Sequence, residues 1–60
     1  MFIITDNKII NLDNYDAIWA DNGGTYVCNA QTPGRRISDR GQITTIVEAI
    51  RRGDNYVEVD

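Results

Sequence analysis

The sequence has 60 residues, enough for one small domain, and 42% of them are hydrophobic while 25% are charged. This mixture is typical of a globular chain and excludes a disordered or fibrous one. It contains no histidine and one cysteine, which excludes imidazole-dependent catalytic triads, the usual zinc sites and an internal disulfide. The net charge of −3 comes from residues 1–34, and an acidic surface argues against nucleic acid as a partner.

The first part of the chain predicts short β-strands joined by tight turns. Residues 1–5 and 8–12 are rich in β-formers, and Asp6-Asn7 between them tolerate positive φ, which predicts a hairpin with a two-residue turn. A third strand is expected over residues 15–20. The strongest turn signal follows it at Asp21-Asn22-Gly23-Gly24.

Two further strands are expected before the pattern changes. Residues 25–31 alternate between two faces, with Tyr26, Cys28 and Ala30 on one of them. Pro33-Gly34 suit the central positions of a type II turn, and residues 35–38 form a short strand around an isoleucine.

A single amphipathic helix is predicted over residues 40–52. Its apolar stripe follows the spacing i, i+3, i+4, i+7 and consists of Ile43, Ile46, Val47 and Ile50. Asp39 is a suitable N-cap and Gln42 can complete a capping box. Gly53 supplies the left-handed residue that ends the helix.

These elements, with a closing strand over residues 56–59, predict one α+β domain spanning residues 1–60. We expect a small, mainly antiparallel sheet of four to six strands whose apolar face is covered by the one C-terminal helix. The closing strand is a candidate sheet edge.

The order of these elements resembles a family of short uncharacterised proteins found in Firmicutes and their prophages. The residues that carry the likeness are Phe2-Ile3-Ile4, Ile9-Ile10-Asn11-Leu12, the helix from Ile43 to Arg52, and Tyr56-Val57-Glu58-Val59. The helix entry Asp39-Arg40-Gly41 departs from the acidic, alanine-rich start usual in that family. The resemblance implies no activity and favours an origin in a mobile element.

No catalytic, cofactor-binding or metal-binding residues are predicted. The only thiol, Cys28, has no histidine to act as its base, and we expect it to pack in the core. The aspartates of residues 11–22 do not fit a calcium loop, because Asp16 stands where that loop needs glycine and Asn22 where it needs glutamate.

The candidate interface residues are four aromatic residues and two arginines. They are Tyr15, Trp19, Tyr26, Tyr56, Arg35 and Arg36. We expect a domain this small to leave some of these aromatic rings at its surface, where they anchor protein contacts. Two alternatives stay open. For Trp19 the alternative is that it is the largest residue of the core. For the arginines the alternative is that they form a solvated rim.

We therefore expect a non-enzymatic protein-interaction or assembly module that forms a homo-oligomer and has no cofactor. The alternative is an acidic inhibitor of a nucleic-acid-binding host protein, of the anti-restriction or anti-CRISPR type, with carboxylates where phosphates would sit. No basic segment followed by an apolar run opens the sequence, so a cytoplasmic location without membrane contact is expected.

Overall fold

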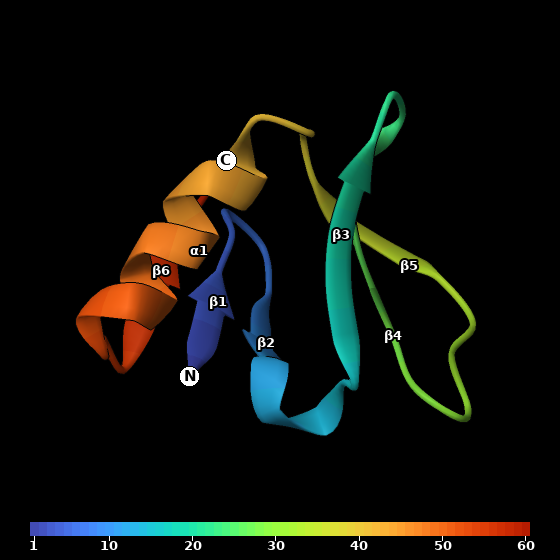
Figure 1. Cartoon of the computed structure of the whole chain (residues 1–60), viewed down its shortest axis with the longest axis horizontal. Helices are drawn as coiled ribbons and strands as arrows, with labels where there is room; N and C mark the ends of the chain where they lie inside the picture. Colours follow the sequence, from blue (N-terminus) through green and yellow to red (C-terminus); the bar gives the residue numbers. More distant parts are fainter.

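The computed structural model describes all 60 residues and divides the six strands between two sheets (Figure 1). The first, the helix-backed sheet, has the order β2-β1-β6 and consists of β1 (Phe2–Ile4), β2 (Ile9–Asn11) and β6 (Tyr56–Glu58). The second, the aromatic sheet, has the order β3-β4-β5 and consists of β3 (Ala17–Asp21), β4 (Gly24–Cys28) and β5 (Arg35–Ser38). The predicted α+β class is confirmed, whereas the expectation of one continuous sheet is wrong.

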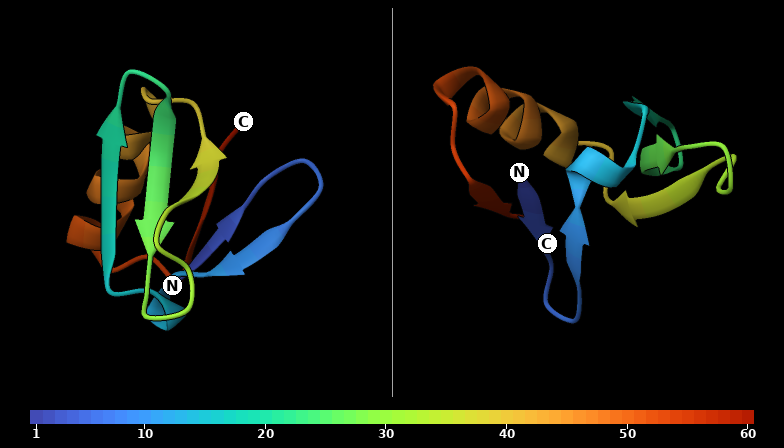
Figure 2. Two further views of the ribbon diagram at one scale, coloured as in Figure 1. Left: turned by 90° about the vertical axis from the view of Figure 1, so that its right-hand side faces the viewer. Right: turned by 90° about the horizontal axis from the view of Figure 1, so that it is seen from below.

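The chain leaves the first sheet through a short 3-10 helix, η1 (Leu12–Asn14). The side chain of Asn11 starts this turn by accepting a hydrogen bond of 3.0 Å from the backbone N–H of Asp13. The N–H of Tyr15 then donates to the carbonyl of Leu12 at 3.1 Å. Figure 2 shows the result: the β1–β2 hairpin is turned away from the plane of β3, β4 and β5. This local turn explains why β3 begins a new sheet.

The main core lies between the helix-backed sheet and α1 (Gln42–Arg52). β1 is the central strand, antiparallel to β2 and parallel to β6, so Ile3 has Ile10 on one side and Val57 on the other. These three residues belong to a hydrophobic cluster of six residues, each at most 8% exposed. Its members are Ile3, Ile10, Ile46, Ala49, Val57 and Val59. Branched aliphatic side chains on three-residue strands therefore form the inner face on which the helix packs.

The helix ends as predicted but does not begin as predicted. Gly53 has φ 75°, and the N–H groups of Gly53 and Asp54 donate to the carbonyls of Ile50 and Ala49, both at 3.0 Å. This is the Schellman arrangement that favours glycine. The first helical residue is Gln42, and no side chain caps the helix at Gly41.

The predicted capping box is therefore wrong, because its aspartate has another partner. The carboxylate of Asp39 accepts a hydrogen bond from Arg36 Nη2 at 3.0 Å. Only the backbone carbonyl of Asp39 serves the helix entry, by accepting from the N–H of Gln42 at 3.1 Å.

The buried stripe of the helix is narrower than predicted. Ile46 and Ala49 are fully buried, and Ile43 and Val47 are half-buried, but Ile50 is 46% exposed. The sheet beneath the helix has only three strands of three residues each, so it covers fewer helical positions than a wider sheet would.

Three predicted turns have different outcomes. The hairpin at Asp6-Asn7 is confirmed by the 2.9 Å bond from the N–H of Thr5 to the carbonyl of Lys8, but no non-glycine residue has positive φ. The β3–β4 turn is confirmed, and Gly24 at its end has φ 147°. A side chain at Gly24 would stand 2.7 Å from the carbonyl oxygen of Ser38, so only glycine fits there.

The predicted type II turn at Pro33-Gly34 is wrong, because Gly34 does not have the positive φ that this turn requires. The loop between β4 and β5 is instead organised by Asn29. Its side-chain oxygen accepts hydrogen bonds from the N–H groups of Gln31 at 3.0 Å and Thr32 at 2.8 Å, which is a typical use of asparagine in turns.

Candidate interaction surface

The outer face of the helix-backed sheet carries a group of exposed apolar side chains. Paired residues on neighbouring strands point to the same side of a sheet, and successive residues point to opposite sides. Since Ile3, Ile10 and Val57 face the helix, their neighbours along each strand point outward. The apolar residues among them, which we call the apolar face, are Phe2, Ile4, Ile9 and Tyr56.

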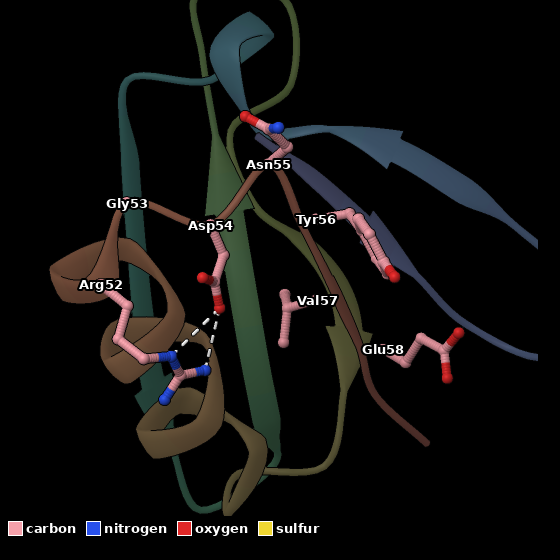
Figure 3. A pocket seen from close by; sticks show the side chains of 7 residues that line it. All are labelled: Arg52, Gly53, Asp54, Asn55, Tyr56, Val57 and Glu58. Atoms are coloured by element: carbon pink, nitrogen blue, oxygen red, sulfur yellow. Dashed lines mark hydrogen bonds and ion pairs between the residues drawn. The ribbon is translucent and has the colours of Figure 1, made fainter.

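The strand register brings these four side chains next to one another. Phe2 is paired with Tyr56, and Ile4 is paired with Ile9. The exposed fractions are 45% for Phe2, 72% for Ile9 and 58% for Tyr56, while Ile4 is half-buried. Figure 3 shows the Tyr56 side chain on the side of β6 opposite to that of Val57. A contiguous apolar patch therefore faces solvent.

The aromatic sheet covers its own outer face. Trp19 on β3 is paired with Tyr26 on β4, which is in turn paired with Arg36 on β5. The rings of Trp19 and Tyr26 are stacked, with centroids 5.6 Å apart and planes inclined by 16°. A Cβ atom on Gly34 would lie 3.8 Å from Trp19 Cη2, so the indole reaches across β4 toward the start of β5. Trp19 is 36% exposed and belongs to this cover, not to the main core.

Both candidate arginines hold parts of the fold together. Arg36 donates from Nε to the carbonyl of Gly23 at 2.8 Å and from Nη2 to Asp39 at 3.0 Å. Arg35 donates from Nη1 to the hydroxyl oxygen of Tyr15 at 3.2 Å. The ring of Tyr15 is half-buried and packs against the core.

The six candidate residues thus lie in three places. Tyr56 belongs to the apolar face, Trp19, Tyr26 and Arg36 form one row across the aromatic sheet, and Tyr15 and Arg35 form a separate pair.

Sequence reasoning missed Phe2, Ile4 and Ile9 as surface residues. A signal was present: residues 2–4 and 9–10 are apolar at every position, although strands covered on one face only need an apolar residue at every second position. Such strands must expose half of their apolar side chains unless a second layer covers them.

The prediction that Cys28 packs in the core is wrong. The fully buried residues of β4 are Thr25 and Val27. Cys28 is half-buried and is paired with Ala17 on the outer side of the aromatic sheet. Val27 and Thr25 are β-branched and fill the inner side, so the alternation of the strand places the cysteine outward with Tyr26.

Comparison with known proteins adds no relative. No family model matches the chain, and neither the curated proteins nor the solved structures yield a match. The likeness to short prophage proteins therefore stays a prediction. No three side chains of the types that bind metals gather in one place, and the single helix is too short and too polar to cross a bilayer.

Proposed function

We propose that this chain is a non-enzymatic protein-interaction module that assembles through its apolar face, in the simplest case with a second copy of itself. The observation that carries the proposal is the group of large apolar side chains exposed by 45–72% on adjacent strands. Contiguous exposed apolar surface of this kind marks contact sites, and aromatic residues are enriched in them.

The size of the domain supports the same proposal. A chain of 60 residues buries only about 60% of the surface that its unfolded form exposes. Covering the apolar face would add burial worth about 25 cal/mol for each Å² removed from water. A two-fold dimer would supply this cover from the same patch on both copies.

The test is sedimentation velocity of the parent and of Ile9→Ser over about a hundredfold range of concentration. We expect the parent to change from monomer to dimer as concentration rises, and Ile9→Ser to remain monomeric. Ile50→Ser is the matched control, because this isoleucine is also exposed but lies on α1, away from the apolar face. Circular dichroism would verify that each variant is folded. A parent that is monomeric at every concentration would contradict self-association.

The alternative function, an acidic inhibitor that mimics phosphates, needs the N-terminal aspartates to gather on one face. Asp16 directly precedes β3 and Asp21 is its last residue, so they lie at opposite ends of the strand, and Asp13 is paired with the N-terminal ammonium group at 3.3 Å. Their separation favours the interaction module. The phage-like origin and the cytoplasmic location are proposals that rest on the sequence alone.

A further inference from the structure

The outer edge of β6 has free backbone hydrogen-bonding groups. The N–H of Phe2 donates to the carbonyl of Asn55, and the N–H of Val59 donates to the carbonyl of Ile4, both at 2.9 Å. In a parallel pair, alternate residues bond to the neighbouring strand. The intervening residues Tyr56 and Glu58 therefore direct their N–H and C=O groups away from β1, and no strand lies on that side.

An open groove runs along this edge (Figure 3). It has a volume of about 650 Å³ and is lined by residues 52–58. A second, separate hollow of about 600 Å³ lies where the ends of β1 and β6 meet, between residues 4–6 and residues 58–60. Unpaired strand edges are templates for the addition of another strand, and this groove leaves room for one.

The charged groups around the edge are mainly acidic. The carboxylates of Asp6, Glu58 and Asp60 line the two hollows, and none of them takes part in an ion pair. The one cation in the lining, Arg52, is held by Asp54 through bonds of 3.1 Å from Nε and 3.0 Å from Nη2. A second copy of this acidic chain would bring like charges together here, whereas a basic segment would complement them.

We propose that the edge of β6 binds an extended basic segment of a partner protein as a fourth strand of the helix-backed sheet. The inference rests on the proposed function, because it describes how the interaction module takes up a partner. The residues of the segment that pair with Tyr56 and Glu58 lie on the outer face of the sheet. A lysine or arginine there meets the Glu58 carboxylate and the Tyr56 ring. The alternate residues lie beside Val57 on the inner face and are apolar.

The probe is a synthetic peptide of alternating lysine and valine, capped at both ends and titrated into the whole chain labelled with ¹⁵N. Two isomeric peptides test the strand geometry. For a segment that adds antiparallel to β6, methylation of the lysine backbone nitrogens removes the donors that would face β6, whereas methylation of the valine nitrogens removes those that face away. We expect shifts centred on the amides of Tyr56 and Glu58, and at least a tenfold weaker affinity for the lysine-methylated peptide only.

A variant of the protein tests the charge. Glu58→Gln keeps the size of the side chain and removes one carboxylate, so we expect the affinity for the lysine peptide to fall about twofold to fivefold at low salt. Thr44→Val, on the exposed side of α1, is the control and should bind like the parent.

Two outcomes would overturn the inference. Equal binding of the two methylated peptides would exclude strand addition, while the self-association test would still decide the proposed function. The second outcome is a dimer that binds none of the peptides and that Glu58→Pro dissociates into monomers. This result would mean that a second copy of the chain occupies the edge of β6. If the parent is monomeric and binds the valine-methylated peptide more tightly than the lysine-methylated one, the inference is supported and only the proposed self-association is contradicted.

Discussion

The two sheets of this protein have the same number of strands, but they differ in how far the side chains on their outer faces are exposed to solvent. The aromatic sheet lays Trp19 across β4 and stacks it on Tyr26, so its own side chains cover part of its outer face and leave the indole 36% exposed. The helix-backed sheet has Phe2, Ile9 and Tyr56 in the equivalent position, and these remain exposed.

The difference follows from the reach of the side chains and the length of the strands. β3 and β4 have five residues each, so they provide a surface long enough for an indole ring to pack on. β1, β2 and β6 have three residues each, and isoleucine is too short to cover a neighbouring strand. The outer face of one sheet is therefore partly covered by its own side chains, whereas the outer face of the other leaves larger fractions of its apolar side chains exposed.

The largest expected effect separates the buried side of α1, which packs on the helix-backed sheet, from its exposed side. Ile46→Ala removes a fully buried side chain that α1 packs against the helix-backed sheet, so we expect the free energy of unfolding to fall by about 2–5 kcal/mol. Ile50→Ala, at a position that is 46% exposed, should change it by less than about 1 kcal/mol. Urea denaturation followed by circular dichroism would measure both. Equal effects would mean that the helix packs with a different face than the structure shows.

The next effect compares the two outer faces directly. Trp19→Ala removes the cover of the aromatic sheet and the stacked pair, so we expect a loss of about 2 kcal/mol in unfolding free energy. Ile9→Ala removes an exposed side chain from the apolar face and should cost less than about 0.5 kcal/mol in the monomer. If Ile9→Ala proves as harmful as Trp19→Ala at low concentration, the apolar face is covered within the chain.

A smaller effect concerns the turn that shapes the aromatic sheet. Gly24→Ala places a Cβ atom 2.6 Å from Arg36 Nε and 2.7 Å from the Ser38 carbonyl oxygen, at φ 147°. We expect a loss of about 1–2 kcal/mol. The control is Gly41→Ala, where φ is −67° and no atom lies within 4 Å of the added carbon. This change should be neutral or stabilising by up to about 1 kcal/mol. Thermal melting curves would rank the two variants, and the reverse order would contradict the backbone geometry.

The smallest expected effect is on a bond that joins the two sheets. The hydroxyl of Ser38 on β5 donates to the carbonyl of Asp60, just beyond β6, at 2.9 Å. Ser38→Ala should therefore lower the unfolding free energy by about 0.5–1.5 kcal/mol. Amide hydrogen exchange should show faster opening at Val59 than in the parent. Unchanged exchange there would mean that the two sheets are held together by apolar packing alone.

Much of the fold could be predicted because its signals are local. The helix end at Gly53 and the turn before Gly24 depend on residues that few alternatives can replace. The division into two sheets could not be predicted, because it depends on the turn that Asn11 starts. The N-cap prediction failed because Arg36 on β5, three residues before Asp39, takes the Asp39 carboxylate.

The candidate surface was predicted only at Tyr56. Its other members, Phe2, Ile4 and Ile9, have the composition of core residues, and only the number of layers in the structure decides which of them stay outside. Trp19 and Tyr26 are stacked on each other, and their place in an interface stays a prediction.

The position of β1 between β2 and β6 also constrains the order in which the strands pair during folding. A ribosome releases β1 and β2 together, and their hairpin closes over a few residues, but the pairing of Phe2 with Tyr56 joins nearly the two ends of the sequence. Contacts of such separation form late and slow the folding of a small domain. The side of β1 that β6 occupies therefore stays unpaired until residues 56–58 are available.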